Sequence, residues 1–141
     1  MRSWIALLPA VLLAVAGCTS TKATTAEDFV KKHAKAYYFD DAKAVAEMTL
    51  CAEDSGQTVL PEYIREELRT FHRDSLVRAL KDEMKEESRW VAAWRDTKYA
   101  GEREHDGHIH VDVKVGYASS SIVLVRVGKT LKIAPNPSSF E

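Results

Sequence analysis

Apolar residues recur at helical spacing in three segments of the first two-thirds of the chain. Residues 25–38 begin with Thr25, whose hydroxyl can accept a hydrogen bond from a free backbone N–H, and acidic residues crowd the first turn. Residues 40–50 predict a second, shorter helix. Residues 61–88 have no glycine and no proline after Pro61, and they predict one long amphipathic helix.

After Trp90 the apolar residues alternate with polar ones or follow one another directly. Alternation is typical of a strand with one buried face, and a continuous β-branched run is typical of a strand buried more completely. Glycine-containing dipeptides between such segments predict tight hairpin turns. The turns are predicted at Asp106-Gly107 and Gly128-Lys129, and the strands at residues 91–103, 108–117, 122–127 and 131–133.

The first eighteen residues have the features of a secretory leader. Residues 4–16 are mostly apolar, and as a helix they would span about 20 Å, less than the roughly 30 Å of a bilayer core. The end of this run, Val15-Ala16-Gly17-Cys18, resembles the lipobox of bacterial lipoproteins. The resemblance implies that residues 1–17 are a signal peptide and that Cys18 is acylated with three chains, enough for firm membrane attachment. The alternative is a short anchor that is never cleaved.

The residues after the lipobox predict a tether and one domain. Residues 18–25 are small and polar and favour a lipidated terminus with a flexible tether. A domain is predicted at residues 26–136 and a short tail at 137–141. Thr19, standing where an aspartate would favour inner-membrane retention, points to the outer membrane of a two-membrane bacterium.

Helices followed by a meander predict an α+β fold, with two short helices and one long helix covering one face of an antiparallel sheet. The element order and the closing segment, residues 121–133, resemble small bacterial lipoproteins of the nuclear transport factor 2-like, cystatin-like superfamily. Leu131 stands where that hairpin usually has a tryptophan. The resemblance implies a curved, cone-shaped sheet, and it assigns no activity.

Charge and cysteine content restrict the function further. Removing residues 1–17 leaves 19 Lys and Arg against 21 Asp and Glu, a net charge of −2 with neutral histidines. We therefore expect no nucleic-acid partner, since the basic surface that nucleic acid requires is missing. Cys51 is the second of two cysteines and is predicted to lie in the core, with an intermolecular disulfide as the alternative.

Three histidines form the one group with metal-ligand residue types, His105, His108 and His110. His108 and His110 are two apart on a predicted strand and point to the same face, and His105 lies across the turn. Three imidazoles can hold Zn²⁺ or Cu²⁺. The competing interpretation is that all three are solvent-exposed surface residues, because they occupy the polar positions of the alternation.

A second group of candidate residues lies on the predicted helices. His33, Tyr37 and His72 are expected to face the sheet, where a proton-transfer site could form in a dry cavity. Trp90 is predicted to close the end of the core, and Trp94 is predicted either to do the same or, with Tyr99 nearby, to line a ligand mouth or partner surface.

The sequence therefore predicts a membrane-anchored, extracytoplasmic lipoprotein with a non-catalytic binding or accessory role and an envelope protein as partner. We predict no cofactor. A small-molecule carrier that uses a helix–sheet cavity is the first alternative, and an enzyme with that cavity as its active site is the second.

Overall fold

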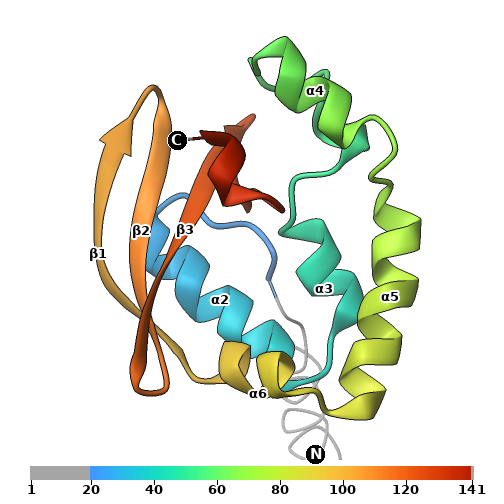
Figure 1. The fold of residues 1–141 in the computed structure, drawn as a ribbon, viewed down its shortest axis with the longest axis vertical. Helices are drawn as coiled ribbons and strands as arrows, with labels where there is room; N and C mark the ends of the chain where they lie inside the picture. The colour runs from blue at the N-terminus through green and yellow to red at the C-terminus, as the bar shows by residue number, and fades with distance from the viewer. Residues whose placement is uncertain (1–19, 141) are drawn as a thin grey trace, which may run out of the picture.

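The computed structural model describes residues 20–140, so the predicted signal peptide and Cys18 lie outside the described part. The described residues form helices packed against a four-stranded antiparallel sheet, which confirms the predicted α+β class (Figure 1). The elements are α2 (Ala26–Tyr38), α3 (Ala42–Glu47), η1 (Ala52–Asp54), α4 (Glu62–Leu68), α5 (Arg73–Glu86), α6 (Arg89–Arg95), β1 (Thr97–His105), β2 (His108–Val115), β3 (Ala118–Val127), β4 (Thr130–Ile133) and η2 (Pro137–Phe140).

The sheet is the predicted meander, with strand order β1-β2-β3-β4. Asp106 and Gly107 both have positive φ values, 51° and 80°, which is the backbone that a two-residue turn between twisted strands requires. Gly128, at φ 61°, starts the last hairpin as predicted. Strand β3 begins at Ala118, four residues earlier than the apolar run suggested, because its first residues pair with β2 although they are exposed.

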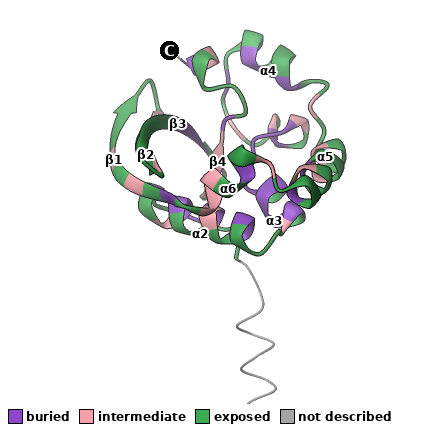
Figure 2. Ribbon diagram, turned by 60° about the horizontal axis from the view of Figure 1, so that its bottom comes forward, coloured by how far each residue is buried: buried purple, intermediate pink, exposed green. Residues whose placement is uncertain are grey.

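One face of the sheet packs on α2. Phe29 and Val30 of this helix contact a cluster built from the inward residues of β2, β3 and β4. Thr25 begins the helix as predicted, its Oγ1 accepting a hydrogen bond of 3.2 Å from the backbone N–H of Asp28. In Figure 2 several buried residues lie on α2 and α3, whereas most of α5 is exposed. The sheet residues in this cluster are Ile109, Val111, Val113, Ile122, Leu124 and Leu131.

The other face of β3 is covered too, so the prediction that helices cover only one face is wrong. Val123, Val125 and Val127 pack against Leu60, α4 and η2. The continuous apolar run of β3 is explained by this arrangement, since both faces of its second half are buried. Phe140 of η2 is 7% exposed and belongs to the core, so the segment expected to be a tail is anchored to the domain by this residue.

The predicted long helix is instead two helices, α4 and α5, separated by residues 69–72. The two helices bury their apolar residues in different clusters: Ile64 and Leu68 face the β3 cluster, whereas Leu80 and Met84 face α2 and α3. A single straight helix cannot reach both. At the break, Glu53 Oε1 accepts a hydrogen bond of 2.9 Å from the backbone N–H of Arg73 and begins α5.

Two other predicted boundaries differ. Residues 91–95 belong to α6 rather than to the first strand, because Val91 and Trp94 pack against the helical cluster. Helix α3 is capped by Asp41, whose Oδ1 accepts from the N–H of Ala44, and not by Asp40, which has a φ of 52°.

The outer edge of β4 is covered by two segments that lie far from it in the sequence. The N–H of Leu131 donates to the carbonyl of Ala23, and Ile133 exchanges hydrogen bonds with residues 48–50. Ala23 is fully buried, so the last residues of the predicted tether are part of the domain. The three hydrophobic clusters lie between residues 23 and 140, so the described segment contains its own core.

Candidate functional site

A cavity of about 470 Å³ lies between the helices and the free side of β3. It forms because β4 pairs only with Leu124–Val127, which leaves the first half of β3 without β4 beside it. Buried residues such as Val45 and Leu80 line it at one end, and the exposed Ser120, Pro135 and Pro137 line it at the other. The cavity is therefore open to solvent on the β3 side.

Aromatic rings surround His33 in this cavity. Phe29, His33 and Tyr37 are spaced four apart on α2 and so lie on one side of the helix. The His33 ring is stacked on Phe29, with centroids 5.3 Å apart, and it meets Tyr37 and Trp94 edge-on at 5.1 and 5.0 Å. Trp90 adds a further edge contact to Tyr37. Of these rings, those of Tyr37, Trp90 and Trp94 line the cavity together with His33 and give this part of it an aromatic lining.

The cavity lining carries no Lys, Arg, Asp or Glu among the described residues that form it. Burial lowers the pKa of His33 to about 4, so the imidazole is neutral at neutral pH. Burial and the charge of Glu83 raise the pKa of Tyr37 above its usual value, so its phenol stays protonated. Thr49 donates its hydroxyl to the carbonyl of Val45 at 2.8 Å. The site is thus uncharged and mostly apolar.

The structure brings some of the predicted helix residues together and not others. His33 and Tyr37 face the cavity as expected. His72 is exposed at the start of α5 and pairs with Glu53, so the prediction that it faces the sheet is wrong. Trp90 is 41% exposed rather than buried, and its Nε1 donates to Glu83.

Trp94 and Tyr99, the remaining aromatic candidates, have different surroundings. Trp94 is half-buried. It packs against two hydrophobic clusters, as the core alternative predicts, and it lines the cavity, as the ligand-mouth alternative predicts. Tyr99 is packed against the α2 side of the sheet and donates its hydroxyl to Glu102, outside the cavity. Of these two aromatic residues, only Trp94 belongs to the site.

The histidines of the β1–β2 hairpin do not share one environment. His110 is 6% exposed, which contradicts the surface interpretation for this residue, and its ring meets that of exposed His105 at 5.6 Å. His108 packs on Phe140 at 4.7 Å and lines a separate hollow beside residues 58–64. Within residues 20–140, no three His, Cys, Asp or Glu side chains are arranged to hold a metal ion.

A buried ionic cluster lies behind the cavity, and sequence reasoning missed it. Asp54 is 5% exposed at its side chain and binds Arg73 at 2.6 Å and Lys132 at 3.0 Å. Its Oδ2 also accepts from the N–H of Cys51, and Arg73 donates further to the carbonyls of Ala46 and Thr49. The cluster joins η1, α3, α5 and β4. The three charged residues are too far apart in the sequence for their spacing to signal contact.

Cys51 is fully buried beside this cluster, which confirms its predicted core position. Burial raises the pKa of its thiol to about 11, although the charge of Arg73 opposes the shift. A protonated, inaccessible thiol is a poor nucleophile and a poor disulfide partner.

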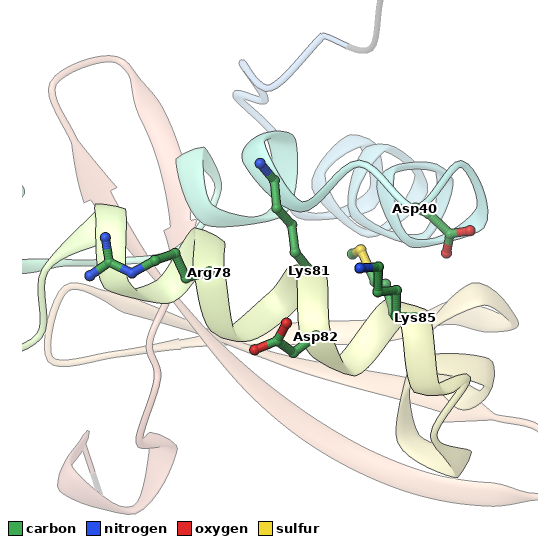
Figure 3. A pocket seen from close by; sticks show the side chains of 6 residues that line it. Asp40, Arg78, Lys81, Asp82 and Lys85 are labelled. Carbon is green, nitrogen blue, oxygen red and sulfur yellow. The ribbon is translucent and has the colours of Figure 1, made fainter.

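A second hollow, on the surface of α5, is charged and exposed, unlike the apolar cavity. It is lined by Arg78, Lys81, Asp82 and Lys85 from α5 and by Asp40 from the α2–α3 connection. Figure 3 shows these side chains pointing in different directions, without a shared centre. The mixed signs and the exposure are those of a solvated helix face.

The structure thus defines an α+β domain with a mostly apolar, aromatic-lined cavity between its helices and its sheet. No helix within residues 20–140 is long and apolar enough to cross a membrane. No family model, no curated protein and no solved structure matches this chain.

Proposed function

We propose that this chain is a membrane-tethered, extracytoplasmic lipoprotein that binds a small, largely apolar molecule in its helix–sheet cavity. The observation that carries the proposal is the cavity itself. It has about 470 Å³, a volume within the range of small-molecule sites, and its lining combines buried aliphatic and aromatic residues with few polar groups.

The composition of the lining supports binding over the two other functions that the sequence left open. A carboxylate placed against a histidine in the cavity would favour an enzyme, and the lining residues of the described chain include no carboxylate. A filled core with an apolar patch near Trp94 would favour a protein partner. Trp94 instead lines an open cavity, and its ring contacts His33 and Tyr37.

The proposed lipid anchor places the cavity close to a membrane. Ala23 is fixed in the domain by burial and by its hydrogen bond to Leu131. Four residues lie between it and Cys18, and the five steps from Cα to Cα can span at most about 18 Å. A domain held so near the bilayer meets apolar molecules at their highest local concentration, because such molecules partition into the membrane.

Narrowing the cavity with a larger side chain is expected to weaken binding of an apolar probe. We choose N-phenyl-1-naphthylamine, which is uncharged and fluoresces in apolar surroundings, and residues 20–140, which contain the whole described core. Replacing Leu76 by Trp puts a larger side chain at a half-buried lining position. The replacement is expected to weaken probe affinity at least tenfold. Fluorescence titration measures the effect.

Val59→Trp is the matched control, because it adds the same ring at a 95% exposed position in the separate hollow near α4. The control is expected to bind the probe as the unmodified domain does. A domain that binds no probe saturably, or an equal loss in both variants, contradicts the proposed function.

Metabolic labelling separately tests the proposed lipid attachment at Cys18. The full chain, expressed in a didermic bacterium with a palmitate analogue, is expected to carry the label and to lose it completely in Cys18→Ala, because the thiol is the acceptor that the lipobox implies. Cys51→Ala serves as the control and is expected to stay labelled, since that thiol is buried. An unlabelled native chain, or label that persists in Cys18→Ala, contradicts the anchor.

A further inference from the structure

One polar atom in the aromatic end of the cavity has no partner. His33 is 3% exposed, and its Nε2 makes no hydrogen bond to any described residue. Leaving a buried polar atom unpaired costs about 1–3 kcal/mol. The apolar ring of phenylalanine would pack among the same rings without this cost. A position that served packing alone would therefore be more stable with phenylalanine than with histidine.

None of the lining side chains, Tyr37 and Trp94 included, hydrogen-bonds to His33 Nε2 in the described chain. The hydroxyl of Thr49 is already bonded to Val45, and the hydroxyls of Ser120 and Ser121 lie at the exposed end. The rings that contact His33 directly are those of Phe29, Tyr37 and Trp94, in stacked or edge-on arrangements. A hydroxyl carried by a molecule in the cavity would supply the partner that Nε2 lacks, if it displaced or replaced any water there.

The chemistry of that entering group is restricted by charge. The lining has no charged side chain to balance an ionised group, and an unpaired charge moved into such a site is heavily penalised. A neutral imidazole nitrogen is either a donor or an acceptor, depending on the tautomer. A hydroxyl satisfies both cases, because it can donate and accept, and an aromatic or aliphatic body matches the surrounding rings.

We infer that the ligand is an uncharged, largely apolar alcohol or phenol whose hydroxyl hydrogen-bonds to His33 Nε2 at the aromatic end of the cavity. This inference rests on the proposed function, since it assigns the ligand class of the same cavity. His33 is then the residue that selects a hydroxylated molecule over a plain hydrocarbon of the same shape.

The test compares 2-naphthol with 2-methylnaphthalene, two probes of similar shape that differ by hydroxyl against methyl. Their affinities for residues 20–140 are measured by equilibrium dialysis and expressed as a ratio. The change in this ratio between the unmodified domain and a variant cancels the different hydrophobicity of the probes. His33→Phe keeps a ring at this position and removes the nitrogen. We expect this variant to shift the affinity ratio about tenfold toward methylnaphthalene, as the loss of one buried hydrogen bond predicts.

His108→Phe is the matched control. Its Nδ1 is also buried without a hydrogen bond in the described chain, but it lies in the separate hollow. The control is expected to keep the ratio of the unmodified domain. An unchanged ratio in His33→Phe, or the same shift in both variants, overturns the inference while leaving the cavity function intact. Failure of the unmodified domain to bind either probe overturns the proposed function instead.

A second readout does not depend on how the variant folds. In the unmodified domain, ¹⁵N resonances of the histidine rings report hydrogen bonding at each nitrogen. Saturating 2-naphthol is expected to change the chemical shift of His33 Nε2 by forming a hydrogen bond. Saturating 2-methylnaphthalene is expected to cause only a small change, because it packs against the ring without a hydrogen bond. Equal shifts with both probes contradict the hydrogen bond.

Discussion

Replacing Asp54 by alanine is expected to lower the free energy of unfolding by about 3–5 kcal/mol, the usual cost of removing one partner from a buried ionic cluster. The substitution leaves Arg73 and Lys132, whose side chains are only 15% and 13% exposed, without their shared carboxylate. It also removes the acceptor for the N–H of Cys51. Urea unfolding of residues 20–140, followed by circular dichroism, measures the change.

Two further variants make this prediction specific. Asp82→Ala removes an exposed carboxylate on α5 and is expected to change stability by no more than about 0.5 kcal/mol. Adding Lys132→Met to Asp54→Ala removes one of the stranded charges and is expected to recover part of the loss. A loss below 1 kcal/mol in Asp54→Ala would mean that the cluster is hydrated in solution.

Acid is expected to destabilise the domain through His33. Burial holds the pKa of this imidazole at about 4 in the folded state, against 6.5 for an unperturbed histidine. Between these values the unfolded chain binds the proton and the folded chain does not, so stability falls as the pH decreases from 6.5 to 4 and is unaffected above 6.5. The contribution of this residue is roughly 3 kcal/mol at pH 4.

The measurement is the difference in unfolding free energy between the unmodified domain and His33→Phe, taken at several pH values. Subtraction removes the contributions of the other titrating groups. His33→Phe is expected to gain relative stability steadily as the pH falls. His105→Phe, which makes the same replacement at an exposed histidine, is the control for introducing a phenylalanine. A constant difference between pH 7 and pH 4 in His33→Phe contradicts the buried, neutral state of His33.

Local signals in the sequence predicted most of the individual elements. Thr25 and the stripe ending at Tyr37 located α2, and two glycine-containing turns located two of the three hairpins, because capping and turn geometry depend on a few neighbouring residues. The β2–β3 turn at Gly116 lies inside a predicted strand. The break between α4 and α5 left no such signal. Residues 69–72 contain neither glycine nor proline, and the break depends on Glu53, which is distant in the sequence.

The candidate site was predictable only in part. The helical spacing of His33 and Tyr37 indicated that both face the interior, and the structure places both on the cavity. Neither their packing with Trp94 nor the missing partner of Nε2 could be derived, because each depends on how α6 is positioned against α2. The exposure of His72 likewise follows from the helix break that precedes α5.

The sequence by itself determined the α+β class, the meander and the burial of Cys51, because hydrophobic periodicity and turn residues act over a few positions. Only the tertiary structure decided that β3 is buried on both faces, that Asp54 joins Arg73 to Lys132, and that a cavity remains beside β3. These features are set by contacts between segments far apart along the chain. The cavity, for example, depends on β4 pairing with only part of β3.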